Sequence, residues 1–320
     1  MKQKRLWKRQ TGSRETAPGK RRTSLIFALL FLAFLGIFDY PFIARIYNQY
    51  RQDAASVAYE DTEAALSPDK NEKMLAAARS YNERLASGTG MEITMSSVFD
   101  ETDLTEKNEE ESQADKPSVI SVEQMLHEEY ESLLNTDGAG TMGRIEIPKI
   151  RVDVLIRHGT SEEVLQKGAG HLEGSSLPVG GESTHVCLSA HRGLTDKEFF
   201  TNLDELEEGD LFFLHILGET LCYRVGDIRT ILPKETDRLT IRSGEDLVTL
   251  ITCTPYGINT HRLCVEGYRI PYTEEVKEEA QSQADSFRIQ IFLQDYGWIF
   301  VTLLFLVTLG IMLWRYNKKK

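Results

Sequence analysis

Hydrophobic residues are concentrated in two long runs near the ends of the chain. The first run, Leu25–Phe38, is followed by Asp39, and the second, Tyr296–Trp314, contains no charged residue. A helix needs about 20 apolar residues to cross a bilayer, and the second run meets that length with aromatic residues at both ends. We therefore predict two transmembrane helices, over residues 23–43 and 296–314.

The first run is short enough to resemble a cleaved signal peptide. No small-x-small cleavage site follows it, because Tyr40–Ile43 come next, and we therefore favour an uncleaved anchor. A soluble protein with two buried helices is the alternative to two spans. The uncharged second run, closed by Asn317 and three lysines, argues against that alternative.

Between the runs, the first part of the chain has a polar and mostly helical pattern. Residues 46–90 are rich in Ala and Glu and are interrupted by Pro68. Residues 92–118 are acidic without clear periodicity, which indicates an exposed segment. A further helix then ends at the turn cluster Asn135–Gly138. Its apolar positions are Val122, Met125, Leu126, Tyr130, Leu133 and Leu134.

From Met142 onward the pattern changes to short alternating or apolar runs separated by Gly, Pro and Asp. The predicted strands are Arg144–Ile147, Val152–Ile156, His185–Ser189, Leu211–Leu217, Leu221–Val225, Ile228–Leu232, Leu247–Thr252 and Arg262–Ile270. A capping box from Thr160 to Glu163 predicts a short helix between two of them. About eight strands with few helices predict a closed β-barrel or a sandwich.

The formal net charge of −12 is distributed unevenly. Residues 1–22 carry +8 and residues 315–320 carry +4, which leaves −24 for the segment between them. An acidic segment of this kind repels nucleic acid, so we exclude a nucleic-acid-binding protein. Because basic residues mark the cytoplasmic ends of membrane spans, we predict cytoplasmic termini and an extracytoplasmic domain over residues of about 45–290.

Cys253 lies where a predicted strand meets a loop. The apolar run Val248–Thr252 ends at this cysteine, and Pro255 and Gly257 then break the strand. A rigid strand end can aim the thiol into a groove, where it attacks a carbonyl and forms a thioester. A buried, inert cysteine is equally compatible with these residues alone.

His191 and Arg262 are the candidate partners of Cys253. His191 ends the apolar run VCLSAHRG and thus has the same strand-end position as the cysteine. Arg262 opens the strand after the cysteine's loop, so a hairpin brings its guanidinium beside Cys253 to stabilise an oxyanion. The alternative role for Arg262 is a surface pair with an acid such as Glu266.

The chain has seven histidines, of which His185 and His215 lie within predicted strands and are assigned to packing or hydrogen bonding, while His127 lies on a polar helix. Cys187, Cys222 and Cys264 are assigned to packing. The other histidines are His158, His171 and His261. The cysteine spacings match no tight disulfide framework, and the absence of a Cys-x-x-Cys pair leaves a zinc site unsupported.

The segment TLITCTPYGINTHR resembles the Thr-Leu-x-Thr-Cys signature of sortases with an arginine nine residues later, and LSAHRG resembles their histidine segment. The longer stretch from MGRIEIPKI to LSAHRG is similar to class C sortases, the pilin polymerases of Gram-positive bacteria. This resemblance covers residues of about 133–271. It implies a closed eight-stranded β-barrel in which Cys253 is the nucleophile, His191 the acid/base, and Arg262 the group that stabilises the oxyanion.

The resemblance also implies the reaction. The Cys253 thiolate would cleave a Leu-Pro-x-Thr-Gly-like sorting signal at the Thr-Gly bond, and a lysine amine of a pilin would resolve the thioester, building covalent pili. No metal or organic cofactor is needed. A wall-anchoring sortase that uses a cell-wall precursor amine is one alternative, and a non-enzymatic membrane-anchored scaffold is another. The expected location is the cell membrane.

Class C sortases usually carry a lid with an Asp-Pro-aromatic motif before the barrel, and this chain departs from that pattern. The nearest candidates are Phe99-Asp100 and the acidic stretch to Asp115, and a solvated linker is the preferred interpretation. The expected segments are basic tails at 1–22 and 315–320, spans at 23–43 and 296–314, a helical and acidic extracytoplasmic region that includes the lid candidates at 44–135, the sortase barrel at 136–272 and a linker at 273–295.

Overall fold

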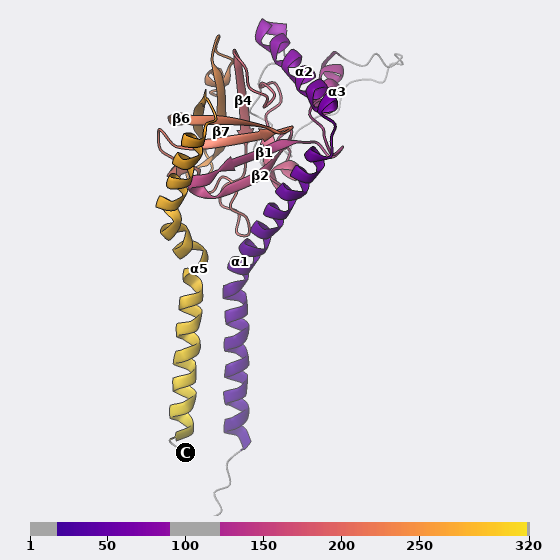
Figure 1. The fold of residues 1–320 in the computed structure, drawn as a ribbon. Coiled ribbons are helices and arrows are strands. Elements are labelled where there is room, and N and C mark those ends of the chain that lie inside the picture. Colours follow the sequence, from indigo (N-terminus) through magenta and orange to yellow (C-terminus); the bar gives the residue numbers. More distant parts are fainter. Residues whose placement is uncertain (1–17, 90–121, 319–320) are drawn as a thin grey trace, which may run out of the picture. The chain divides into compact units, whose positions relative to one another are not determined.

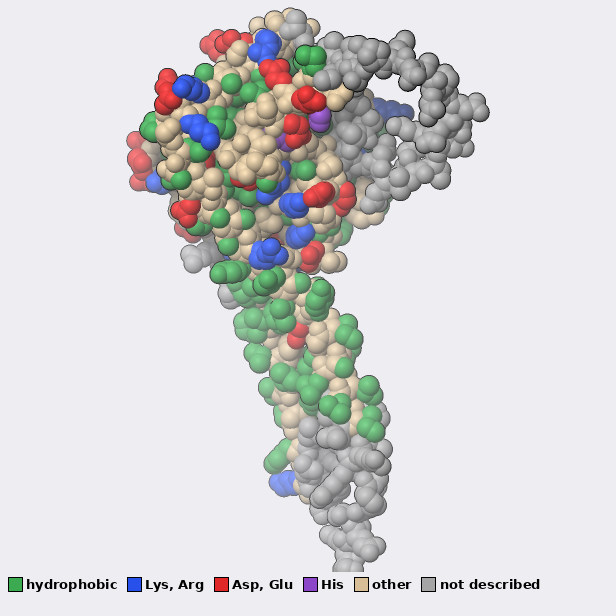
Figure 2. All heavy atoms as spheres, turned by 90° about the vertical axis from the view of Figure 1, so that its right-hand side faces the viewer, with side chains coloured by type: hydrophobic (Ala, Val, Ile, Leu, Met, Phe, Trp, Pro, Cys, Tyr) green, Lys and Arg blue, Asp and Glu red, His purple; other side chains and the backbone are tan. Residues whose placement is uncertain are grey.

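The computed structural model describes residues 18–89 and 122–318 (Figure 1). The chain divides into two compact units, Met1–Pro41 with Trp298–Lys320, and Phe42–Gly297. Figure 2 shows hydrophobic side chains covering the first unit, whereas charged side chains of both signs are spread over the second. The acidic segment and the lid candidates Phe99-Asp100 and Asp115 lie outside the described residues.

The first unit consists of the first part of α1 (Pro18–Ala64) and the last part of α5 (Glu274–Lys318). The rings of Phe31 and Phe305 lie 6.4 Å apart, edge to face. Oγ1 of Thr302 donates a 2.8 Å hydrogen bond to the carboxylate of Asp39. This contact provides a polar partner for a carboxylate in an apolar helix, as polar side chains do between helices in a bilayer.

Of the two predicted spans, the described residues support one. The helix over Leu29–Ala64 is long and apolar enough to cross a membrane by length and composition, with a mean hydropathy of 1.8 in its most apolar part. The apolar stretch Tyr296–Met312 of α5 is shorter than a full span. The second span therefore stays a prediction.

The helices after the first apolar run confirm the helical pattern interrupted at Pro68. Helix α1 ends at Ala64, and α2 (Pro68–Arg84) begins with proline at its first position, where no backbone N–H is needed. Oγ of Ser67 caps α2 by accepting from the N–H of Lys70. A short π-helix, η1 (Leu85–Thr89), follows, and α3 (Val122–Ser132) precedes the first strand.

The predicted eight-stranded closed barrel is confirmed. Its strands are β1 (Thr141–Ile147), β2 (Val152–His158), β3 (Ala169–His171), β4 (Thr184–Ser189), β5 (Leu211–Ile216), β6 (Glu219–Ile231), β7 (Asp246–Thr254) and β8 (His261–Ile270). Their order around the barrel is β1-β2-β3-β4-β7-β8-β6-β5. Short helices between the strands are η3 (Pro148–Ile150), α4 (Glu162–Leu165), η4 (Leu203–Glu205) and η5 (Asp237–Leu239).

The set of strands differs from the predicted set in two places. The predicted strands Leu221–Val225 and Ile228–Leu232 are one strand, β6, with a register shift between Val225 and Asp227. Gly226 lies at this bulge, where an added Cβ would come within 2.9 Å of the Tyr268 ring. The glycine that ended the predicted strand therefore bends a continuous one.

Strand β3, which the sequence pattern did not predict, completes the barrel. It has only three residues, and it pairs parallel to β2 and antiparallel to β4. Helix α4 was predicted correctly, but its cap was not. The N-cap is Ser161, whose side chain accepts from the N–H of Val164, and Thr160 lies one residue earlier.

The segment 273–295, expected to be a linker, is helical from Glu274 onward, where α5 begins. The carboxylate of Glu279 pairs with both terminal nitrogens of Arg224 at 2.6 and 2.8 Å. Oε1 of Gln283 accepts from the N–H of Leu211 at 3.0 Å. These contacts attach the beginning of α5 to strands β5 and β6.

Candidate active site

Strands β4, β7 and β8 are neighbours in the barrel and carry the three residues singled out by sequence. Cys253 is the penultimate residue of β7, and Arg262 is the second residue of β8. The antiparallel register pairs Cys253 directly with Arg262. Directly opposed side chains in such a pair have Cβ atoms roughly 4.5–5.5 Å apart, so the thiol and the guanidinium project from adjacent positions.

His191 follows β4 at the same end of the barrel. Strands β4 and β7 are parallel, with Ser189 opposite Ile251, so two further residues along each chain bring His191 to the level of Cys253. The pairing continues past β4, because the N–H of Ala190 donates to the carbonyl of Ile251 at 3.2 Å. Oγ1 of Thr252 also donates to the carbonyl of Ala190 at 2.9 Å.

Arg262 is held by the loop that joins β7 to β8. Its Nη1 donates to the carbonyls of Asn259 and His261, each at 3.1 Å, and the residue is 5% exposed. Two hydrogen bonds close the turn in this loop, because the N–H groups of Ile258 and Asn259 both donate to the carbonyl of Pro255. The guanidinium is therefore held against the backbone of this loop, while Glu266, the acid considered from the sequence, is paired with Arg229 and Arg242.

His191 is held by the loop after β4. Its carbonyl accepts from the N–H of Phe200 at 3.2 Å, and its side chain is 16% exposed. Nε2 of its ring lies 3.2 Å from Oε2 of Glu162 on α4. This contact was not expected from the sequence, which carries no local signal for it because the two residues meet only in the folded barrel.

The loops after β4 and β7 pack against each other beside the three residues. Gly193 has φ of +80°, and a Cβ there would lie 2.9 Å from the Tyr256 ring. The Arg192 guanidinium lies 5.8 Å from the centre of the same ring and is paired with Asp204. A glycine is required at this position by both the backbone angle and the contact with the aromatic ring.

The other three cysteines are buried in the core, as the sequence analysis expected. Cys187 and Cys264 pack with Ile251 in one small cluster, and Cys222 lies in another. Burial raises the pKa of the thiol to about 11 for Cys222 and to about 12 for Cys264. These three thiols are therefore poor nucleophiles, because the thiolate is the reactive form.

The other histidines predicted to be structural have structural partners. His185 bonds the carbonyl of Thr240 and the hydroxyl of Thr249, at 3.0 and 2.7 Å. His215 bonds Glu146, and His127 on α3 bonds Glu173. These histidines therefore belong to packing and hydrogen-bond networks.

Among residues 18–89 and 122–318, no group of three or more His, Cys, Asp and Glu side chains is arranged to hold a metal ion.

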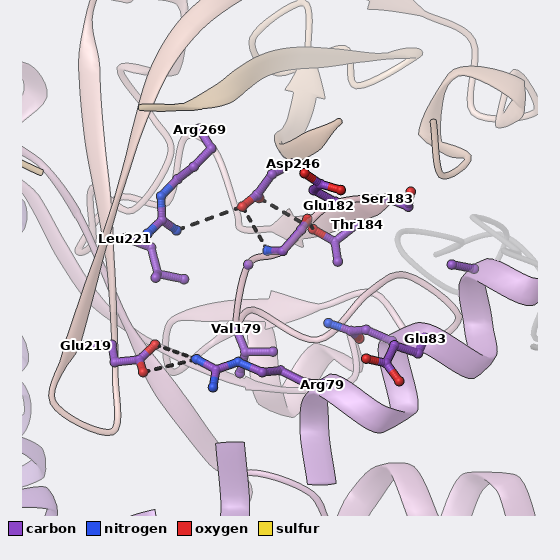
Figure 3. A pocket seen from close by; sticks show the side chains of 14 residues that line it. Arg79, Glu83, Val179, Glu182, Ser183, Thr184, Glu219, Leu221, Asp246 and Arg269 are labelled. Atoms are coloured by element: carbon purple, nitrogen blue, oxygen red, sulfur yellow. Dashed lines mark hydrogen bonds and ion pairs between the residues drawn. The ribbon is translucent and has the colours of Figure 1, made fainter. Parts of the chain in front are cut away.

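A cavity of about 820 Å³ lies at the opposite end of the barrel, next to the first residues of β4 and β7 (Figure 3). There Arg79 pairs with Glu219, and Arg269 approaches Asp246. Asp246 is seven residues from Cys253, roughly 23 Å along a strand, so this cavity is separate from the candidate site.

Comparison with known proteins points to one family. A sortase-domain family profile matches residues 145–270. Sortase D of Bacillus subtilis (strain 168) is 30% identical over 131 residues, which are 40% of this chain and 63% of that protein. The match thus spans less than two thirds of the length of that relative.

Solved structures of sortases match a larger part of the chain. Sortase C1 of Streptococcus agalactiae is 40% identical with a TM-score of 0.57, and the match covers 69% of this chain and all of that one. Sortase C of Streptococcus pneumoniae, described with its catalysis and pilin substrate specificity, is 36% identical with a TM-score of 0.54 over 69% of this chain and 98% of that one.

Proposed function

This chain belongs to the sortase family, and on that premise we propose that it is a class C transpeptidase that builds covalent pili. It cleaves a Leu-Pro-x-Thr-Gly-like sorting signal between Thr and Gly and joins the threonine to a lysine amine of a pilin. The support for pilins as substrates is the similarity to the Streptococcus pneumoniae enzyme, whose structure is described with pilin substrate specificity.

The reaction has two acyl-transfer steps. The Cys253 thiolate attacks the threonine carbonyl carbon, and the C–N bond to glycine breaks as the leaving amine takes a proton from His191, which leaves a thioester. The lysine amine then attacks the thioester carbonyl and loses a proton to His191. The C–S bond breaks, an isopeptide bond forms, and the Cys253 thiolate is regenerated.

Arg262 stabilises the oxyanion in both steps. The observation that supports this assignment is the direct register of Cys253 with Arg262, together with the position of His191 at the same level of the neighbouring strand. A guanidinium beside the attacking sulfur offers fixed donors to the oxygen on which negative charge develops. Its 5% exposure strengthens this interaction because little water competes with it.

We further propose that the chain spans the membrane twice, with both termini in the cytoplasm and the barrel outside the cell. The apolar helix over Leu29–Ala64 supports the first span. The uncharged run Tyr296–Trp314, followed by a basic tail, supports the second.

The test is the substitution Cys253→Ala in the full-length chain, in a strain that produces the pilin. We expect the ladder of pilin polymers to disappear, with Cys222→Ala as the matched control that keeps it. If surface attachment is lost while polymers remain, the enzyme is a wall-anchoring sortase. Persistence of both in the Cys253→Ala strain refutes the transpeptidase proposal.

A thiol-reactive peptide analogue of the sorting signal distinguishes the enzyme from a binding scaffold. We expect it to label one cysteine per chain, at Cys253, because the other three thiols are at most 2% exposed except where the protein unfolds. Peptide mapping after labelling identifies the cysteine. Absence of labelling in the folded protein would favour the scaffold.

A further inference from the structure

Glu162 makes a contact with His191 that the reaction described above does not use. The two oxygens of the Glu162 carboxylate lie 3.3 and 3.2 Å from Nε2 of the His191 ring. Glu162 is the first residue of α4, which lies between β2 and β3. A carboxylate at this distance accepts a hydrogen bond from Nε2–H and orients the imidazole.

The Glu162 side chain is itself held in place. Nε2 of Gln166, one turn later, donates to Oε1 of Glu162 at 2.6 Å. The carbonyl and side-chain oxygens of Gln166 in turn accept from Nζ of Lys197, at 2.7 and 3.1 Å. Lys197 belongs to the loop that carries His191. Two contacts therefore connect α4 to this loop, one from Glu162 to His191 and one from Gln166 to Lys197.

We propose that Glu162 is a positioning residue, which orients the His191 ring through Nε2. The inference rests on the proposed role of His191 as the acid that protonates the leaving amine. With Nε2–H donated to Glu162, Nδ1 is the nitrogen that exchanges protons with the sulfur and the reacting amines. Loss of the carboxylate therefore slows proton transfer without removing any group that touches the substrate.

The test compares Glu162→Gln with Glu162→Asp and Glu163→Gln in the full-length chain, using a sorting-signal peptide and an amine acceptor. Glu163 is the matched control, because it is the next residue on α4 but pairs with Lys167 at 2.7 Å and is 81% exposed. We expect Glu162→Gln to lower kcat about threefold at unchanged KM, the size typical of a partly exposed ion pair. Glu162→Asp retains the charge and should restore part of the rate.

Rescue by the conservative variant separates a positioning role from a structural effect. The kcat of Glu162→Asp should lie between those of the wild type and Glu162→Gln, while KM is the same in all three proteins. Glu163→Gln should keep the wild-type kcat and KM. Thermal unfolding of each variant checks that the fold is unchanged.

The variant His191→Ala separates the two proposals. If it retains activity, the proposed role of His191 fails, and the role of Glu162 fails with it. If His191→Ala is inactive while Glu162→Gln and Glu163→Gln have the same kcat, the positioning role of Glu162 alone is overturned and the proposed function stands.

Discussion

Cys253 and Arg262 are direct register partners across the β7–β8 pair, and Nη1 of Arg262 donates to two carbonyls of the loop between them. The β7–β8 hairpin therefore brings a permanently charged group beside the thiol and fixes the orientation of that group through hydrogen bonds to its own backbone. The orientation of the guanidinium is therefore fixed in the folded chain, and its proposed role in stabilising an oxyanion needs no reorientation.

Substitution of Arg262 should distinguish charge from geometry. We expect Arg262→Ala to lower kcat/KM by about 10²–10³, the usual effect of removing an oxyanion donor. The kcat/KM of Arg262→Lys should lie between those of the wild type and Arg262→Ala, because an ammonium keeps the charge but cannot reproduce the planar set of donors of a guanidinium. Steady-state kinetics with a sorting-signal peptide measure both.

Arg269→Ala is the matched control for Arg262, because Arg269 lies on the same strand at the opposite end of the barrel, 4.0 Å from Asp246. It should leave kcat/KM near the wild-type value. An equal loss of activity in Arg269→Ala and Arg262→Ala would point to a general defect of the barrel and contradict the local role.

The hydrogen bond from Thr252 to the carbonyl of Ala190 should matter for activity as well as stability. Thr252→Val removes it without changing the volume of a fully buried side chain, and we expect a loss of about 1 kcal/mol of stability. Since Ala190 precedes His191, a shift of the imidazole should lower kcat/KM about tenfold. Thermal unfolding and kinetics on the same sample separate the two effects.

Thr249→Val provides the comparison for Thr252→Val. Thr249 is on the same strand, is 1% exposed, and bonds the structural His185 at 2.7 Å. Its substitution should cost a similar amount of stability while kcat/KM stays unchanged. If both variants lose activity equally, the effect follows stability and not the position of His191.

His171 should make the protein less stable in acid. The ring is fully buried, and burial lowers the pKa of its imidazole to about 4. The unfolded chain binds this proton near pH 6.5, so the stability due to neutral His171 is complete above that pH and is lost as the pH falls towards 4. We expect this group to lower the free energy of unfolding by about 3 kcal/mol between pH 7 and pH 4.

Urea unfolding at several pH values tests this prediction. The variant His171→Gln should flatten the dependence on pH, whereas His127→Gln, at an exposed histidine paired with Glu173, should keep the acid-side loss. An unchanged slope in His171→Gln would mean that other groups cause the acid sensitivity.

Asn82 should be the strongest single attachment of α2 to the barrel. Its side chain donates to the carbonyl of Leu177 at 3.0 Å and accepts from the N–H of the same residue at 2.7 Å. Asn82→Ala leaves two buried backbone groups without these partners, so we expect a loss of about 2–3 kcal/mol. Arg79→Ala removes an exposed pair with Glu219 from the same helix and should cost at most about 1 kcal/mol.

The hydrophobic pattern of the sequence predicted about eight strands in a closed barrel or a sandwich, and the strand ends that carry Cys253, His191 and Arg262. These features depend on local patterns: alternating apolar runs, and the breakers Pro255 and Gly257 directly after the cysteine. The resemblance to sortases selected the closed barrel. The prediction that Gly226 ends a strand was wrong, because this glycine lies at a bulge within one continuous strand, β6. A bulge and a turn have similar local composition, and only the neighbouring strand distinguishes them.

Tertiary structure alone decided strand β3, the contact of Glu162 with His191, and the bond between Thr252 and Ala190. Each depends on residues that are distant in sequence and are brought together by the parallel pairings of β2 with β3 and of β4 with β7. Parallel pairing joins strands through long crossovers, so its register is set by packing of the whole barrel. For that reason the chain's own pattern identifies the three candidate residues, while the folded barrel determines which groups contact them.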